Sequence, residues 1–172
     1  MKRHAFLRQA AIRSGSLIAI PFLSNGQVSS LLKNLKDDAL PPEKVKDFVV
    51  AGHSDLVKVK SLLQEIPTLL YATWDWGGGD FETALEGAGH VGNKEIANYL
   101  VSLGARTNLF VLTMLGKTQI VTSFLDAYPE YINARGPHGF TFLHHAQRGG
   151  EDSQELLAYF QAKGLTKTKT QL

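Results

Sequence analysis

The chain of 172 residues contains no cysteine, which excludes a disulfide framework, a cysteine-ligated zinc site and a cysteine nucleophile. It also lacks a long hydrophobic run. The longest, Leu17 to Leu23, is far shorter than the roughly 18 apolar residues of a membrane-spanning helix. We therefore expect one globular domain that is not an integral membrane protein.

An excess of basic charge is lacking outside the N-terminal segment. The first thirty residues contain four charged side chains, all of them basic: Lys2, Arg3, Arg8 and Arg13. The rest of the chain has 14 basic and 16 acidic side chains, a net charge of −2. Because proteins that bind nucleic acid neutralise phosphates with a basic face, we expect no nucleic-acid partner.

Residues 1–25 have the layout of an export signal, with basic residues followed by an apolar stretch from Gly15 to Leu23. The segment Arg3-His4-Ala5-Phe6-Leu7 resembles the twin-arginine export signal, with His4 at the second arginine position. The resemblance implies an exported, periplasmic protein. The alternative is an amphipathic helix that packs on the domain, which leaves a cytoplasmic protein. Residues 26–42 are expected to form a linker, because Pro41 and Pro42 end any preceding helix.

From Glu43 onward the sequence repeats. Four segments carry apolar residues at helical spacing, and their first branched residues are Val59, Ile96, Ile120 and Leu156. These positions are separated by 37, 24 and 36 residues. Because helices this short cannot bury an apolar stripe alone, we expect the repeated units to stack on one another.

Two of these units contain the residues typical of a known repeat family. The second unit reads Thr83-Ala84-Leu85-Glu86-Gly87-Ala88, then Gly92, Glu95-Ile96 and Gly104-Ala105-Arg106-Thr107-Asn108, and the fourth begins Thr141-Phe142-Leu143-His144-His145-Ala146. This pattern resembles the ankyrin repeat. The resemblance implies an all-α ankyrin-repeat solenoid of about four helix-turn-helix units over residues 43–165, joined by short hairpin fingers. Residues 166–172 are expected to be a flexible tail.

Individual motif positions have predictable roles. A threonine before a helix can cap its free amides, so Thr83 and Thr141 mark helix starts. Glycines between and after paired helices favour left-handed backbone, which applies to Gly92, Gly104, Gly116 and Gly164. The family resemblance implies that His144 hydrogen-bonds within its turn and is structural.

The connections between units differ in length. The interval from Ala134 to Thr141 is 7 residues, the usual length for a finger in the family, whereas that from Ala72 to Thr83 is 11. We therefore expect an enlarged first finger. The second finger is absent, because Asn108 runs directly into an apolar helical segment and the unit spacing falls to 24 residues.

The enlarged finger contains both tryptophans of the chain, a residue type enriched where binding energy is concentrated. The candidate binding residues are Trp74, Asp75, Trp76, Asp80 and Phe81 of the first finger and His138 of the last finger, the interval from Ala134 to Thr141. Two alternatives remain. The tryptophans could fold back over the place of the missing finger, or residues 77–79, all glycine, could cradle a phosphate, although the lysine of a P-loop is missing.

The histidines near the C-terminus raise the question of a metal. His138, His144 and His145 are close in sequence, and Asp80 or Glu82 could approach from the first finger. Consecutive helical side chains point about 100° apart, so two adjacent histidines cannot easily bind one ion. We therefore expect no metal site, no cofactor and no catalytic residue, with His145 at a semi-exposed position.

Two functions are compatible with these observations. The first is an exported ankyrin module that binds a protein or peptide through its concave face and enlarged first finger. The alternative is a small-ligand protein or hydrolase, with a carbohydrate-like ligand. Its site would consist of Trp74, Asp75, Trp76, Asp80 and His138. Neither function predicts the identity of the partner or the oligomeric state.

Overall fold

The structure, a computed structural model, describes residues 39–172, and Leu40–Leu172 form one compact unit. The predicted export signal at residues 1–25 and nearly all of the predicted linker lie outside the described residues. Among the described helices, none combines the length and the apolar character needed to cross a membrane.

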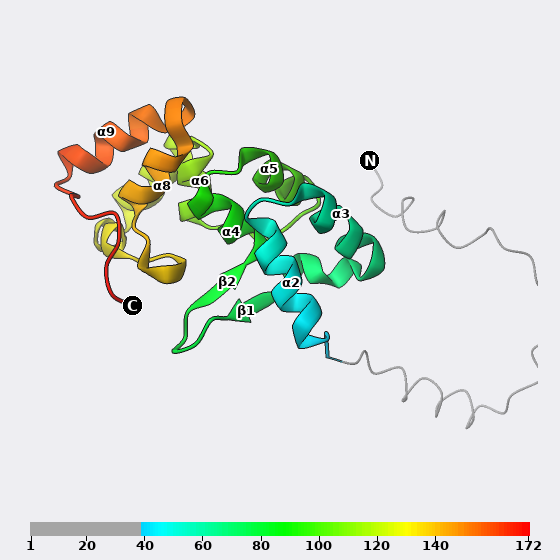
Figure 1. The fold of residues 1–172 in the computed structure, drawn as a ribbon. Coiled ribbons are helices and arrows are strands. Elements are labelled where there is room, and N and C mark those ends of the chain that lie inside the picture. The colour runs from blue at the N-terminus through cyan, green and yellow to red at the C-terminus, as the bar shows by residue number, and fades with distance from the viewer. Residues whose placement is uncertain (1–38) are drawn as a thin grey trace, which may run out of the picture. The chain divides into compact units, whose positions relative to one another are not determined.

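Helices make up most of the described chain, and they follow one another in pairs (Figure 1). The α-helices are α2 (Pro42–Gly52), α3 (Leu56–Glu65), α4 (Ala84–Val91), α5 (Lys94–Ser102), α6 (Leu109–Met114), α7 (Thr118–Ala127), α8 (Phe142–Gly149) and α9 (Gln154–Ala162). Short 3-10 helices are η2 (Pro67–Tyr71), η3 (Pro129–Asn133), η4 (Pro137–Gly139) and η5 (Gly150–Ser153). The two strands are β1 (Thr73–Asp75) and β2 (Phe81–Thr83).

The pairs stack in chain order. Within each pair the two helices contact each other, and the first helices form a row in which α2 contacts α4, α4 contacts α6 and α6 contacts α8. Figure 1 shows this progression from α2 to α9 across the molecule. The described chain is therefore mostly helical, with one small two-stranded sheet.

Local sequence signals explain where the helices begin and turn. Thr83 and Glu86 form a reciprocal capping box on α4, and the Thr141 hydroxyl accepts from the first turn of α8. All four glycines predicted to be left-handed, Gly92, Gly104, Gly116 and Gly164, have positive φ. These predictions are confirmed.

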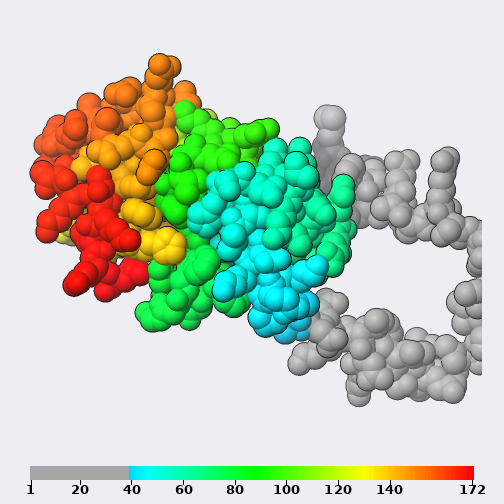
Figure 2. Space-filling model, viewed as in Figure 1, coloured from blue at the N-terminus to red at the C-terminus, as the bar shows by residue number. Residues whose placement is uncertain are grey.

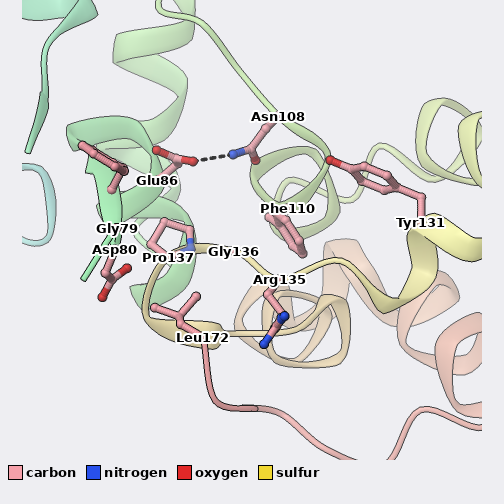
Figure 3. A pocket seen from close by; sticks show the side chains of 11 residues that line it. Gly79, Asp80, Glu86, Asn108, Phe110, Tyr131, Arg135, Gly136, Pro137 and Leu172 are labelled. Carbon is pink, nitrogen blue, oxygen red and sulfur yellow. Dashed lines mark hydrogen bonds between the residues drawn. The ribbon is translucent and has the colours of Figure 1, made fainter. Parts of the chain in front are cut away.

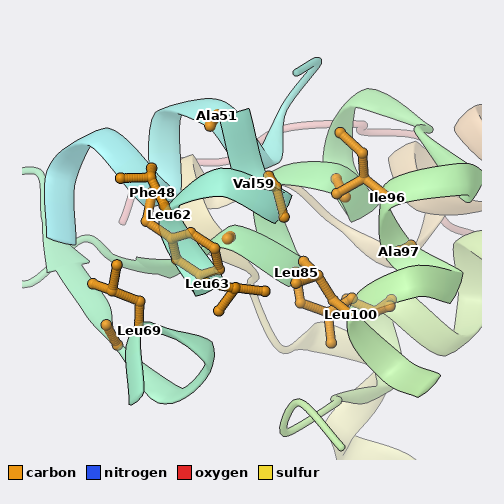
Figure 4. Packing of buried hydrophobic residues seen from close by; sticks show 14 of the residues in the cluster. Phe48, Ala51, Val59, Leu62, Leu63, Leu69, Leu85, Ile96, Ala97 and Leu100 are labelled. Carbon is orange, nitrogen blue, oxygen red and sulfur yellow. The ribbon is translucent and has the colours of Figure 1, made fainter. Parts of the chain in front are cut away.

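The core consists of two clusters. The larger joins α2 through α6 and includes Phe48, Leu85, Ile96 and Leu100; in Figure 4 Phe48 lies beside Leu62 and Leu63, and Leu85 beside Leu100. The smaller joins α6 through α9 around Phe142 and Phe160.

The apolar register of the third pair differs from the prediction. The sequence analysis aligned Ile120 with Ile96, but Ile120 is 55% exposed, whereas Val121 is fully buried. The buried positions of α7 are Val121 and Leu125. The predicted register was therefore wrong by one residue. Ile120 and Val121 are adjacent and both apolar, so the sequence pattern alone did not show which of them faces the core.

The first finger is a β-hairpin. Strands β1 and β2 pair antiparallel, with Trp74 opposite Glu82. Gly77, Gly78 and Gly79 connect the strands with φ of 111°, 66° and 88°, a left-handed path that side chains rarely adopt. The hairpin projects away from the helices in Figure 1 and forms the green protrusion at the lower edge of the molecule in Figure 2.

The second finger is absent among the described residues, as predicted. Asn108 directly caps α6, accepting from the amide of Val111 at 3.0 Å, and α6 is only 6 residues long. Because this connection is short, α4 of the second pair contacts α8 of the fourth pair directly, although the third pair, α6 and α7, lies between them in sequence. The ion pair between Lys94 Nζ and Asp152 Oδ2, at 2.5 Å, joins the same two pairs of helices.

The C-terminal segment differs from the flexible tail predicted for residues 166–172. The amide of Thr141 donates to Thr168 O at 3.0 Å, and the amide of Thr170 donates to Gly139 O at 2.9 Å. Phe140 and Lys169 form an isolated antiparallel bridge. Residues 168–170 therefore pair with the last finger through the backbone groups of Gly139 and Thr141.

Candidate functional site between the fingers

The predicted site residues separate into two groups. Trp76, Asp80 and His138 come together where the first finger meets the last. Trp74, Asp75 and Phe81 do not join them. Trp74 packs on the larger core cluster with Lys46 Nζ 5.6 Å from its ring centroid, and Asp75 Oδ1 accepts from the amide of Gly77 at 2.8 Å. Trp74 therefore packs against the first helix pair and Asp75 stabilises the turn.

Asp80 joins the two fingers through His138. Its Oδ1 accepts from the His138 amide at 2.8 Å, and its Oδ2 contacts His138 Nδ1 at 2.6 Å. Partial burial raises the pKa of Asp80, but the two hydrogen bonds from His138 outweigh this effect and lower the pKa below its usual value. The absence of the second finger lets these two fingers meet.

His138 has an unusual backbone. With φ of 59° it is the only described residue other than glycine with a positive φ. Left-handed backbone costs a non-glycine residue free energy, so such a residue persists only where its surroundings hold it. The two bonds to Asp80 supply that restraint and direct the ring toward β2.

Glu82 is the centre of the site. The side chain is fully buried, and three histidines surround it. His90 Nε2 lies 2.8 Å from Oε1, His138 Nε2 lies 3.5 Å from Oε1, and His53 Nε2 lies 3.6 Å from Oε2. Trp76 Nε1 donates to Oε2 at 2.9 Å and covers the carboxylate from the first finger.

The charge state of Glu82 follows from these neighbours. Burial raises the pKa of the carboxyl, but the close approach of His90 and His53 and the Trp76 donor together lower it below the usual value. The carboxylate is therefore ionised at neutral pH. Oε1 accepts no hydrogen bond from any described residue, although His90 Nε2 is 2.8 Å away. The hydrogen-bond partner of His90 Nε2 is instead His53 Nε2, at 3.0 Å.

Helix ends position His53 and His90. His53 follows the last residue of α2, and its Nδ1 contacts Val49 O at 3.0 Å. His90 lies in the last turn of α4 and stacks on Phe140, with the ring centroids 5.1 Å apart. A Cβ at Gly87 would be 2.8 Å from the His53 ring, so only glycine leaves room for it there.

The two histidines of α8 lie outside this group. His144 Nε2 contacts the carbonyl of His90 at 2.8 Å and therefore has a structural role between helices, not within its own turn. His145 is 1% exposed, so the predicted semi-exposed position was wrong. It packs on the Phe110 ring, and burial lowers its pKa to about 3.

A cleft occupies the place of the missing finger. Its volume is about 280 Å³, and Figure 3 shows its walls converging from the first finger, α6 and the last finger. Asn108 Nδ2 donates to Glu86 Oε1 at 2.7 Å on one wall, and burial raises the pKa of Glu86. The lining residues are Gly79, Asp80, Phe81, Glu86, Asn108, Phe110, Tyr131, Arg135, Gly136, Pro137 and Leu172.

Sequence analysis missed His53 and His90, although a signal was present. Both end an Ala-Gly-His tripeptide, and they are 37 residues apart, the same interval that separates Val59 from Ile96. The repeat therefore places them at equivalent positions of successive units. Glu82 was considered as a partner of His138, His144 and His145, of which only His138 lies beside it.

Comparison with known proteins identifies no relative: family models, curated proteins and solved structures contain no match to this chain.

Proposed function

We propose that this chain is an exported ankyrin-type repeat protein that binds an extended segment of a partner protein. The stacked helix pairs, the threonine caps and the left-handed glycines at equivalent positions support the ankyrin-type assignment. The basic and apolar character of residues 1–25 supports export.

The observation that carries the binding proposal is the cleft at the place of the missing finger. In a row of stacked fingers each hairpin covers its neighbour, whereas here the first and last fingers meet at Asp80 and His138 and leave a cleft beside this contact, over α6. An extended peptide has the width of one strand of a finger and would occupy this space. The partner would then complete the row of fingers.

The side chains of the cleft suit a peptide of mixed character. Phe81 is 57% exposed on its rim and offers apolar contact area, while Phe110 and Tyr131 line the opposite wall. Arg135 and Asn108 supply hydrogen-bond donors to peptide carbonyls. Trp74 and Asp75 are not among the lining residues of this cleft, so we favour a peptide over the small-ligand alternative.

The test uses two substitutions of matched exposure. Phe81→Ala removes an exposed side chain at the cleft, and Ile120→Ala removes one with 55% exposure on α7. Proteins captured from an extract of the source cells by the wild type would be identified, and peptides from them titrated by calorimetry. We expect Phe81→Ala to weaken peptide binding by about 1 to 2 kcal/mol and Ile120→Ala to leave it unchanged. Equal affinity for all three proteins would exclude the cleft as the binding site.

A further inference from the structure

We propose that His53, Glu82, His90 and His138 bind one divalent transition-metal ion, with Zn²⁺ as the best fit. This inference does not depend on the peptide proposal. The four residues come from the end of α2, from β2, from α4 and from the last finger. Each offers one ligand atom, and all four atoms lie within 4.8 Å of one another.

The distances between these atoms suit a tetrahedral ion. Zinc bonds to nitrogen and oxygen of 2.0–2.2 Å place neighbouring ligand atoms about 3.3 to 3.6 Å apart. The His53 and His90 Nε2 atoms are 3.0 Å apart, and Glu82 Oε1 lies 2.8 Å from His90 Nε2 and 3.5 Å from His138 Nε2, with every separation in the group within 4.8 Å. Only small side-chain shifts are needed to place an ion at their centre.

The hydrogen bonds around the rings prepare two of them as ligands. His53 Nδ1 contacts the carbonyl of Val49, and His138 Nδ1 contacts the carboxylate of Asp80. Both partners can only accept, so each Nδ1 carries a hydrogen. In the neutral rings each Nε2 therefore carries a lone pair: that of His53 faces His90 Nε2 at 3.0 Å, and that of His138 faces Glu82 Oε1 at 3.5 Å. Histidine ligands of metals are held in the same way by carbonyl and carboxylate partners.

A cation resolves an otherwise unfavourable arrangement. The carboxylate of Glu82 is fully buried, its Oε1 accepts no hydrogen bond from the described residues, and His138 Nε2 lies 3.5 Å from this oxygen. Buried polar atoms normally have partners, so each exception needs an explanation. A metal ion would satisfy Oε1 and the nitrogen lone pairs together.

The backbone is adapted to the same arrangement. Gly87 leaves space for the His53 ring, and the left-handed backbone of His138 brings its ring to Glu82. Phe140 supports the His90 ring by stacking. Gly87 lies on α4 and the other two features on the last finger, and all three orient a ligand.

The donor set indicates the class of metal. Three imidazole nitrogens and one carboxylate suit Zn²⁺ and its neighbours Co²⁺, Ni²⁺ and Cu²⁺, whereas Ca²⁺ and Mg²⁺ prefer oxygen. Four protein ligands complete a tetrahedral shell, which is the pattern of structural sites. The ion would therefore hold the first finger, the last finger and the first two helix pairs together.

The experiment uses the full chain without a histidine tag, stripped with a chelator and titrated with ZnCl₂ by calorimetry. We expect one ion per chain. Glu82→Gln should weaken binding at least about 100-fold, a loss at the upper end of that seen when supporting groups alone are removed. The control is Glu95→Gln, an exposed glutamate of α5 outside both proposed sites, which should bind as the wild type does.

Two further variants keep the test decisive if Glu82→Gln fails to fold. His138→Asn retains a residue type that tolerates left-handed backbone but removes the imidazole. Gly87→Ala retains the helix and crowds the His53 ring. Each should weaken Zn²⁺ binding at least about 10-fold. Substitution of Co²⁺ should produce the intense visible absorption of a tetrahedral site.

The opposing results are equally defined. Less than half an ion per folded chain, or wild-type affinity in all three variants, would overturn the proposal. So would a Co²⁺ spectrum with only the weak bands of an octahedral ion, because that indicates binding at surface groups. Circular dichroism of each variant before titration separates lost binding from lost folding.

Discussion

The Nε2 atoms of His53 and His90 lie 3.0 Å apart, although 37 residues separate the two histidines in the chain. The interval equals the spacing between the first two repeated units, so the same place in successive helix pairs supplies both rings. Stacking of identical units brings equivalent residues into register across their interface. When two neighbouring units carry the same residue at equivalent positions, stacking therefore brings the two side chains together.

The buried helix face of α5 should be the most sensitive part of the core. Ile96 and Leu100 are each 1% exposed in the cluster that joins α2 through α6. Substitution of either by alanine should lower the free energy of unfolding by about 2 to 5 kcal/mol, because each leaves a cavity between packed helices. Urea unfolding measures this loss. Ile120→Ala, at an exposed position, should change stability by less than about 0.5 kcal/mol.

The two tryptophans should differ in their contribution to stability. Trp74 packs on the core, so Trp74→Ala should lower the free energy of unfolding by about 2 kcal/mol. Trp76→Phe retains an aromatic ring but removes the donor to Glu82, and we expect a loss of about 1 kcal/mol. Denaturant unfolding of each single variant compares them. Similar losses for both variants would contradict the different packing of the two rings.

His145 should make the protein sensitive to moderate acid. Its folded-state pKa of about 3 lies below the usual value of 6.5, so the unfolded chain binds the extra proton between these values. The contribution of His145 is therefore complete above about pH 6.5 and declines as the pH falls toward 3. Between pH 7.5 and 5 the loss is about 2 kcal/mol.

The measurement for His145 is a comparison with His145→Gln, which retains a donor for the Thr141 carbonyl but does not titrate. Urea unfolding at pH 7.5 and pH 5 should show a steeper loss for the wild type, by about 2 kcal/mol. Other groups titrate in both proteins and cancel in the difference. Parallel pH dependence would show that His145 is not held neutral.

The pairing of the C-terminal segment with the last finger is testable by truncation. Removal of residues 166–172 deletes the acceptor for the Thr141 amide and the Lys167 carbonyl that accepts from the Thr141 hydroxyl at 2.7 Å. We expect hydrogen exchange at the Thr141 amide to accelerate about tenfold or more, as for loss of a bond of about 1.4 kcal/mol. The amide of Ile96, in the distant core, should keep its rate. Unchanged exchange at Thr141 would restore the prediction of a flexible tail.

Local features of the sequence predicted much of the fold. The threonine caps, the left-handed glycines, the helix pairs and the absent second finger all depend on residues close together in the chain. Such features follow from backbone geometry and hydrogen bonding within a turn or two. The enlarged first finger followed in the same way from the length of one interval and its three glycines.

The tertiary structure alone decided which side chains meet. The sequence indicated that Asp80 and His138 belong to fingers, but they are 58 positions apart and no sequence signal predicts their contact. The contact forms because the short third unit lets α4 reach α8, and the two remaining fingers then close on each other. His145 is buried against Phe110 of α6, and the register of α7 was settled by which face the neighbouring helices covered. Sequence periodicity determines the repeating unit, whereas the contacts between distant units depend on how the irregular ones pack.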